Sequence, residues 1–303
     1  MSDIQVIAPP TPAPTNAKPV RATTNHERIR LSELEDGGIL KLVRNATFIS
    51  RGQVHSLAKR FKLSDKRSTI DWRLQRLSTI GLLDQLPRIY PFRGAVYTIT
   101  HAGLQVLEFW NEGLASITSG SEHLADAIQA PHFLVLNAVH IALSSSPACK
   151  LLTWRSDREI ASLNYSLPTL FAKDYDAIAE FNVDNRRLTV GIEYERTFKT
   201  NEDRYPELRK RLQTETQLNL VLYLTPTKDM ILRLLPLLCL KNDNQTAAAS
   251  PNSSSAVRAP LPICVASASA FIDKTFGATV SYLQGGEPRQ TTFTEFLIAK
   301  RTR

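Results

Sequence analysis

The sequence lacks the short motifs that would by themselves assign a reaction. It has no internal repeat, no glycine-rich loop of the phosphate-binding type and no nucleophile-elbow motif. Its 3 cysteines are scattered and odd in number, which argues against a disulfide framework and against a cysteine-based zinc site. The function must therefore be sought in the arrangement of common polar residues.

Long apolar runs are also lacking. The first 20 residues have no extended apolar core of the signal-peptide type. Segment 230–240 is apolar but too short for a membrane span, and it contains Arg233 and Pro236. Together with the scattered cysteines, this predicts a cytoplasmic protein without a membrane partner.

The composition is that of a globular protein with an excess of positive charge. With 303 residues, of which 43% are hydrophobic, the chain can bury a full core and is long enough for two domains. The net charge of +8 favours a polyanionic partner. From composition and pattern we expect a disordered tail over 1–25, a helical domain over 26–112, a linker over 113–130, and a second domain over 131–303 with a low-complexity insertion at 241–260.

The first domain has the pattern of three helices closed by a hairpin. Apolar spacing predicts helices around 39–43, over 53–61 and over 66–80, the last with Ser64 as its N-cap. Strands are expected at 82–86 and 95–99, followed by a helix over 100–110. Helix, helix, helix, strand, loop and strand is the order of a winged helix-turn-helix.

Basic residues are concentrated on the second and third of these helices. Between Arg51 and Arg76 the chain carries eight basic residues and only two acidic ones. In a winged helix-turn-helix the third helix enters the major groove, and the wing lies against the backbone. The alternatives are a solvated charged face or a winged helix used for protein contacts. The expected DNA-binding residues are Lys66, Arg67, Ser68, Trp72, Arg73 and Arg76 on the helix, joined by Asp71, and Arg88 and Arg93 on the wing.

The second domain is organised around a predicted hairpin over 176–195. Apolar and polar residues alternate in both arms, and a two-residue turn at 184–185 brings both apolar sets to one face. That register places Asp176 opposite Glu193 and puts Glu195 on the same face. Three acids so close are costly unless a cation lies between them, so the pattern predicts a Mg²⁺ site. The alternative is the solvated face of an ordinary hairpin.

The surrounding elements predict a helix-strand-strand-strand-helix-strand core. A helix is expected from about 131, a strand at 151–154, the hairpin, a helix over 202–217 and a buried strand over 218–224. We further expect a turn or short helix at 157–161, a helix over 228–240 and a strand at 263–266. His132 and His140 lie on the first helix, where no partner at ligand spacing accompanies them, and both are interpreted as structural or solvated histidines and not as metal ligands.

Several segments together resemble the replication-relaxation family of bacterial plasmids and mobile elements. The similarity runs from about residue 36 to 226, and its order and spacing are more specific than any one segment. It is carried by RLQRLSTIGLLDQL, AVYTITHAGLQVL, HFLVLNAVHIAL, LLTWRSDREIA, the stretch from YDAIAEF to IEYERTFK, and VLYLTP.

The resemblance implies a second domain of the PD-(D/E)XK, or restriction-endonuclease-like, fold. Asp176 then matches the first acidic position of that fold and Glu193 the second, and both would bind the metal with Glu195. The position of the usual catalytic lysine falls on Glu195, which cannot stabilise negative charge on a phosphate. Lys199 or Lys210 could reach into the site instead.

Three hypotheses follow for this α+β protein. The first is a DNA-binding protein of plasmid or mobile-element replication or mobilisation, whose nuclease-like domain is degenerate and contacts double-stranded DNA, a relaxase, a replication initiator or a second copy. The second is a Mg²⁺-dependent endonuclease or nickase that uses Asp176, Glu193, Glu195 and one of the two lysines. The third is a winged-helix transcriptional regulator.

Overall fold

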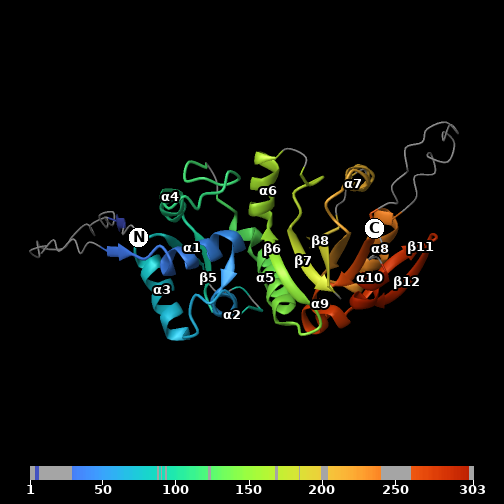
Figure 1. The fold of residues 1–303 in the computed structure, drawn as a ribbon, viewed down its shortest axis with the longest axis horizontal. Coiled ribbons are helices and arrows are strands. Elements are labelled where there is room, and N and C mark those ends of the chain that lie inside the picture. The colour runs from blue at the N-terminus through green and yellow to red at the C-terminus, as the bar shows by residue number, and fades with distance from the viewer. Residues whose placement is uncertain are drawn as a thin grey trace, which may run out of the picture. The chain divides into compact units, whose positions relative to one another are not determined.

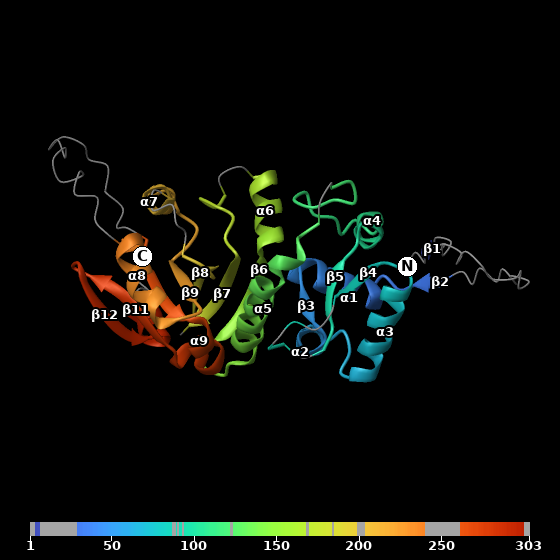
Figure 2. The ribbon, with the colours of Figure 1, turned by 180° about the vertical axis from the view of Figure 1, so that it is seen from behind.

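The chain folds into two compact units. The computed structural model describes residues 4–6, 29–86, 89, 91–92, 94–121, 124–167, 170–183, 185–198, 204–239 and 261–299. The units are Met1–Ala130 and Pro131–Arg303. Both mix helices and strands, in agreement with the predicted α+β class (Figures 1 and 2).

The first unit has four helices and a small antiparallel sheet of strand order β3-β5-β4 within its described residues. The predicted helices and both predicted strands are present, and β3 is an additional strand that the pattern did not indicate. One further strand, β1 (Ile4–Val6), lies in the segment predicted to be disordered and pairs with β2 (Ile29–Leu31). The remaining elements are α1 (Glu35–Ala46), β3 (Ile49–Ser50), α2 (Arg51–Arg60), α3 (Arg67–Thr79), β4 (Leu83–Leu86), β5 (Val96–Ile99) and α4 (His101–Phe109).

The starts of the helices follow from local hydrogen bonding. α2 begins with a capping box in which Ser50 and Gln53 satisfy each other's backbone N–H groups. The prediction for α3 was wrong in one detail, because its N-cap is Lys66 and not Ser64. The Ser64 hydroxyl accepts the backbone N–H of Lys66 at 3.2 Å, which closes the turn just before the helix instead of capping it.

A buried carboxylate joins α1 to α3. The Asp36 side chain is 0% exposed and accepts hydrogen bonds from Arg73 Nη1 at 2.9 Å and Arg76 Nη2 at 3.0 Å. Its second oxygen also accepts the backbone N–H of Ser32 at 2.8 Å. Because both arginines come from α3, Asp36 fixes the position of α3 against α1 and the apolar core around Ile39.

The second unit is built on a seven-stranded mixed sheet of order β12-β11-β10-β9-β8-β7-β6 (Figures 1 and 2). β6, β7 and β8 form an antiparallel meander, and β8, β9 and β10 run parallel. The short helix η1 (Ala127–Gln129) falls within the first unit and precedes α5 (Ala130–Ser145). After α5 the elements are β6 (Lys150–Ser156), α6 (Asp157–Ser166), β7 (Ala177–Val183), β8 (Arg186–Tyr194), α7 (Arg204–Gln213), β9 (Leu220–Thr225), α8 (Lys228–Cys239), β10 (Ile263–Ser267), α9 (Ala268–Lys274), η3 (Thr275–Gly277), β11 (Thr279–Gln284), β12 (Glu287–Thr292) and α10 (Phe293–Ala299).

The hairpin has the predicted register. Ala177 pairs with Ile192, and the ladder continues to Val183 opposite Arg186, which leaves only positions 184 and 185 for the turn. Asn185 adopts φ 63°, a left-handed conformation that Asn tolerates better than most residues. Residue 184 lies outside the described part of the chain.

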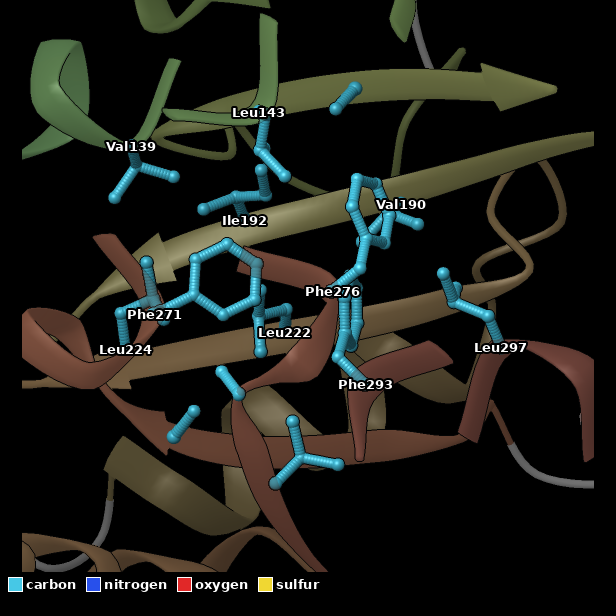
Figure 3. Packing of buried hydrophobic residues seen from close by; sticks show 14 of the residues in the cluster. Val139, Leu143, Val190, Ile192, Leu222, Leu224, Phe271, Phe276, Phe293 and Leu297 are labelled. Atoms are coloured by element: carbon cyan, nitrogen blue, oxygen red, sulfur yellow. The ribbon is translucent and has the colours of Figure 1, made fainter. Parts of the chain in front are cut away.

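The sheet is covered on both faces, as expected for the strand over 218–224, so the alternative of a solvated face on the hairpin is wrong. The predicted apolar face packs on α5, α9 and α10, as the side chains of Val139, Phe271 and Phe293 show (Figure 3). On the opposite face Ile178 is also 0% exposed, in a cluster with side chains of α6, α7 and α8. The acids at the end of this face therefore border a buried core instead of an open hairpin surface.

The elements after β9 go beyond the expected helix and single strand. α8 and β10 were predicted, whereas β11, β12, α9 and α10 were not. The proposed insertion at 241–260 lies outside the described residues. Phe276, Phe293 and Phe296 from this region are each at most 1% exposed and complete the core of the sheet.

One described helical stretch, Ala127–Ser145, is long and apolar enough to cross a membrane, with a mean hydropathy of 1.3. Core helices of soluble proteins meet the same criterion. Leu134 and Val139 are 0% exposed and Leu143 is 1% exposed, and Val139 and Leu143 belong to the core cluster that covers the sheet (Figure 3). Packing therefore accounts for these three apolar residues of the helix.

Candidate functional site

The acids predicted from the hairpin lie where β7 begins and β8 ends. Asp176 directly precedes β7, and the ladder that pairs Ala177 with Ile192 brings Asp176 opposite Glu193. One oxygen of Asp176, Oδ2, accepts the backbone N–H of Tyr194 at 2.7 Å. This hydrogen bond fixes the carboxylate where the two strands end and leaves Oδ1 for a second partner.

That second partner is His132, near the start of α5. Its Nε2 lies 3.4 Å from Asp176 Oδ1, and its ring packs against Tyr194 at 5.5 Å between centroids. Burial lowers the pKa of the imidazole, but Asp176, with smaller contributions from Asp157 and Glu193, outweighs burial, and the pKa of His132 is raised above its usual value.

The same pair shifts the pKa of Asp176 in the opposite direction. Burial raises the pKa of the Asp176 carboxyl, but the imidazole of His132 and the Tyr194 N–H both lower this pKa. The positive charge of Lys173 also lowers the Asp176 pKa. The net pKa lies below the usual value, so Asp176 is ionised near neutral pH.

Glu193 has a different cationic partner. The ammonium of Lys173 lies 2.7 Å from Glu193 Oε1, and the two side chains are 17% and 12% exposed. The ammonium also lies 5.3 Å from the centroid of the Tyr175 ring, a cation–π contact. Lys173 is thus held between an acid and an aromatic face.

The segment that carries Lys173 and Asp176 is fixed by a buried acid. Glu215, only 4% exposed, accepts the Ala172 N–H at 2.9 Å, the Tyr175 hydroxyl at 3.1 Å and the Gln217 N–H at 2.7 Å. Burial raises the pKa of the Tyr175 hydroxyl, and the charge of Glu215 raises it further, so the hydroxyl stays protonated and donates. The backbone on both sides of Lys173 is therefore anchored.

Tyr175 in turn requires a glycine in the neighbouring strand. A Cβ atom on Gly191 of β8 would lie 3.1 Å from the Tyr175 ring and 2.7 Å from Leu218 Cδ1. The absence of a side chain at Gly191 lets the tyrosine lie directly on the sheet beneath the charged cluster.

A third acid, Asp157, lies at the first position of α6. Ser156 caps this helix, in a capping box with Glu159. Burial raises the pKa of Asp157 to about 6, and the negative charge of Asp176 contributes to the rise. We define the acidic cluster as Asp157, Asp176 and Glu193 together with their cationic neighbours His132 and Lys173.

A separate charged surface lies at the start of α3 in the first unit. Lys66, Arg67, Ser68 and Trp72 are exposed, and the Trp72 side chain is 53% exposed. The end of α2 and the turn that follows it add further exposed basic side chains. We define the α3 surface as these four residues with Lys59, Arg60 and Lys62.

Other predicted DNA-binding residues of α3 have internal partners. The Arg73 guanidinium is held by Glu35 and Asp36, and its side chain is only 10% exposed. Arg76 binds Asp36 and also lies 5.0 Å from the Trp72 ring. These contacts give both arginines a structural task, and they hold the Trp72 ring in place.

Asp71, in the same helix, is also engaged within the unit. Arg51 Nε donates to Asp71 Oδ1 at 2.7 Å, and His55 Nε2 lies 2.7 Å from the same oxygen. The hydrogen bond from Arg51 holds the pKa of the Asp71 carboxyl below its usual range. Arg88 and Arg93, predicted for the wing, lie outside the described residues.

Comparison with protein families gives a match that extends over residues 40–197 to the model of the replication-relaxation family. The chain belongs to the replication-relaxation family. Membership indicates a role related to replication or mobilisation. No curated protein and no solved structure shows significant similarity to the chain.

The part of this replication-relaxation protein that matches the family contains both charged regions. It spans the α3 surface and extends past Glu195, so all members of the acidic cluster are included. Lys199 and Lys210 lie beyond the matched residues. The family match therefore favours the acidic cluster, and not α7, as the centre of the second unit.

The remaining predicted site residues have different positions. Glu195 follows β8, where its backbone N–H donates to Leu224 O at 2.9 Å, and its charge contributes to the raised pKa of the buried Tyr223. Lys210 is exposed on α7. Lys199 lies outside the described residues. Within the described ranges, no three His, Cys, Asp or Glu side chains form a group that could hold a metal ion.

Sequence reasoning missed His132, Asp157 and Lys173. The parity argument covers only residues inside paired strands, whereas Lys173 lies in the irregular segment before β7. His132 and Asp157 reach the cluster from helices that are 44 and 19 residues before Asp176 in the sequence. The one local signal was the capping pattern Ser156 to Glu159, which marks the start of a helix with an acid in its first turn.

Proposed function

We propose that this replication-relaxation protein is a DNA-binding protein of plasmid or mobile-element replication or mobilisation. Its first unit would locate a double-stranded DNA site, and its second unit would be a nuclease-like domain. The observation that carries this proposal is the division of α3 into two faces. Its arginines at 73 and 76 are engaged with Asp36, while Lys66, Arg67, Ser68 and Trp72 are exposed.

The element order of the first unit supports a winged helix-turn-helix. Three helices, α1 to α3, are followed by the antiparallel strands β4 and β5, and β3 pairs with β5 as the third strand. In this fold the N-terminal half of the third helix enters the major groove. The exposed basic residues of the α3 surface lie at this end of the helix, where phosphate contacts position a protein on DNA.

The topology of the second unit supports a restriction-endonuclease-like fold. α5, β6, β7, β8, α7 and β9 follow in the expected order, with an antiparallel meander whose last strand pairs in parallel with β9. α6 is an addition between the first two strands. Asp176 and Glu193 occupy the two acidic positions of this fold, and Glu195 occupies the position of its lysine.

The described side chains do not fit a Mg²⁺ ion in this arrangement. The Asp176 and Glu193 carboxylates are engaged by His132 and Lys173, and the described residues contain no three-ligand group. Mg²⁺ needs several oxygen ligands at about 2.0–2.1 Å. The nuclease-like unit is therefore proposed to be degenerate.

A second candidate function, that of a metal-dependent DNA nickase, is favoured by one observation, although a metal ion would first have to displace Lys173 from Glu193. The case against cleavage is that Glu195 replaces the lysine of the fold. Lys173 nevertheless brings an ammonium to within 2.7 Å of Glu193 Oε1. Nicking of supercoiled plasmid in Mg²⁺ or Mn²⁺, abolished in Asp176→Ala and Glu193→Ala with folding intact, would establish this function.

The proposed setting follows from the family and from charge. The protein would act in the cytoplasm on double-stranded DNA, with a relaxase, a replication initiator or a second copy as protein partner. A footprint that covers an origin or transfer region supports this role. A footprint confined to the protein's own promoter would favour a transcriptional regulator instead.

The α3 surface is tested by the double variant Lys66→Ala/Arg67→Ala. Each lost phosphate contact lowers the slope of log affinity against log salt by about 0.9, so we expect a decrease of about 2. Fluorescence anisotropy with a labelled duplex measures this slope. The matched control is Lys228→Ala/Arg289→Ala, which removes the same charge from exposed positions in the second unit. An unchanged slope in the α3 variant would refute the helix-groove arrangement.

A further inference from the structure

We propose that Lys173 is the residue with which the second unit contacts a DNA phosphate, and that Glu193 is its positioning residue. This inference rests on the proposed DNA-binding function and adds a contact point in the second unit. The ligand class is a phosphodiester group of the DNA backbone. The candidates expected from the sequence for this task were Lys199 and Lys210.

The position of Lys173 carries the proposal. Its ammonium lies 2.7 Å from Glu193 Oε1 and 5.3 Å from the Tyr175 ring centroid. Its charge also lowers the pKa of Asp176, which places it within electrostatic reach of both acids. The cation therefore lies among the acids of the cluster. In the restriction-endonuclease-like fold the lysine follows the second acid by two residues, and that position is Glu195 in this chain.

The charges of the cluster explain why a cation is needed there. Two ionised carboxylates repel a phosphate that approaches within a few ångströms, and the repulsion is stronger in the partly buried environment of a protein than in water. A cation placed among them offsets this repulsion and presents a hydrogen-bond donor to the phosphate. Lys173 meets both requirements, since an ammonium has three N–H donors and one acid uses only part of them.

The backbone around Lys173 is organised in advance. Glu215 accepts the N–H of Ala172 and the hydroxyl of Tyr175, the residues at positions −1 and +2 from the lysine. Asn164 accepts the N–H of Phe171 at 3.0 Å and donates to Asp174 at 2.7 Å. A short segment held at so many points positions its side chain for binding at a low entropic cost.

Salt-dependent DNA binding by the full-length protein tests this proposal. Lys173→Met removes the charge and keeps much of the apolar stem, and we expect the salt slope to fall by about 0.9, the value for one phosphate contact. Lys173→Arg retains the charge and should keep the wild-type slope. The matched control is Lys150→Met at the start of β6, an exposed lysine opposite Asn182 at the far end of the strands from Asp176. It should also keep the wild-type slope.

A second variant guards against a change in folding. Glu193→Gln removes the negative charge but keeps the side-chain shape and an amide oxygen that can still accept a hydrogen bond from Lys173. The lysine therefore stays in position while the phosphate meets less repulsion, and DNA affinity should rise about threefold or more. If the ion pair had only a structural role, Glu193→Gln would instead lower thermal stability and leave DNA affinity unchanged. If wild-type protein nicks plasmid, Lys173→Met should also reduce the nicking rate about 100-fold, as for loss of a charge-stabilising group.

The outcomes separate this inference from the proposed function. A wild-type slope in Lys173→Met together with unchanged affinity in Glu193→Gln overturns the Lys173 contact alone. Normal binding by the Lys66→Ala/Arg67→Ala variant, with a reduced slope in Lys173→Met, overturns the α3 surface and supports the Lys173 contact. Failure of the wild-type protein to bind DNA overturns both.

Discussion

The charge networks around Asp36 in the first unit and around Asp176 in the second use similar residues in opposite ways. Asp36 is 0% exposed, and its carboxylate accepts hydrogen bonds from two arginines and a backbone N–H. Asp176 is 26% exposed and lies in a cluster that contains two further acids, a histidine and a lysine. One network is sealed from water, and the other is partly exposed.

The difference separates architecture from a candidate site. A sealed carboxylate with all its donors present fixes the relative position of the elements that supply them. In the second network the carboxylates raise the pKa values of their neighbours, as at Asp157 and His132. Such shifts are concentrated at functional sites. The first network should therefore matter chiefly for stability, and the second chiefly for binding.

The largest effect that this comparison predicts is for Asp36→Ala. The substitution leaves the Arg73 guanidinium buried without its main partner and frees Arg76, and breaking such a buried pair costs about 3–5 kcal/mol. Urea denaturation followed by circular dichroism should show this loss in the unfolding of the first unit. Asp65→Ala, at an exposed position before α3, is the control and should change stability by less than about 0.5 kcal/mol. A loss below about 1 kcal/mol in Asp36→Ala would mean that the sealed network does not hold α3 in place.

A smaller loss of stability is expected for Glu215→Ala, which removes the carboxylate that anchors the segment carrying Lys173 and Asp176. The N–H groups of Ala172 and Gln217 and the Tyr175 hydroxyl lose their acceptor, which should cost about 2–3 kcal/mol. Thermal unfolding measures the change, and Glu207→Ala on the exposed face of α7 is its matched control. Equal stability of the two variants would show that Glu215 does not anchor the segment, and the positioning of Lys173 would need another explanation.

The sequence predicted the hairpin in detail because a buried face fixes strand register. Alternating apolar residues allow only one parity, and a two-residue turn then determines that Asp176 faces Glu193. The helices of the first unit were predicted for the same reason, since Ile70, Leu74 and Leu77 follow the helical period. Local periodicity therefore specified the elements that pack on a single core.

The partners of the acids could not be predicted in this way. The contact of His132 with Asp176 depends on how α5 packs against the sheet, and that of Lys173 with Glu193 depends on an irregular segment shaped by Glu215. The second buried face was also missed, because Ile178 is a single apolar residue in a polar row and α6 was expected only as a turn or short helix. Contacts between distant segments decided each of these features.

The smallest effect is expected for Asp157→Asn, and it is opposite in sign because the substitution should increase the stability of the second unit at high pH. The folded protein raises the pKa of Asp157 to about 6, above its usual value of 3.8, so the folded state binds this proton more tightly than the unfolded state. Protonated Asp157 therefore stabilises the folded protein fully below about pH 4, and this stabilisation is lost as pH rises through about 6. Above that pH Asp157 is ionised, and the buried charge makes the protein less stable than it would be with a neutral side chain there.

Removal of the carboxyl abolishes this penalty. We expect Asp157→Asn to gain about 1–2 kcal/mol at pH 8, because partial exposure and the helix dipole reduce the full linkage energy, and to change little near pH 4. Thermal unfolding at the two pH values measures the difference, with Asp229→Asn in the exposed first turn of α8 as a control that should show no pH-dependent gain. A variant that is less stable than wild type at pH 8 would show that the Asp157 charge stabilises the folded protein. The charges of the second network would then be compensated within the protein, as those around Asp36 are.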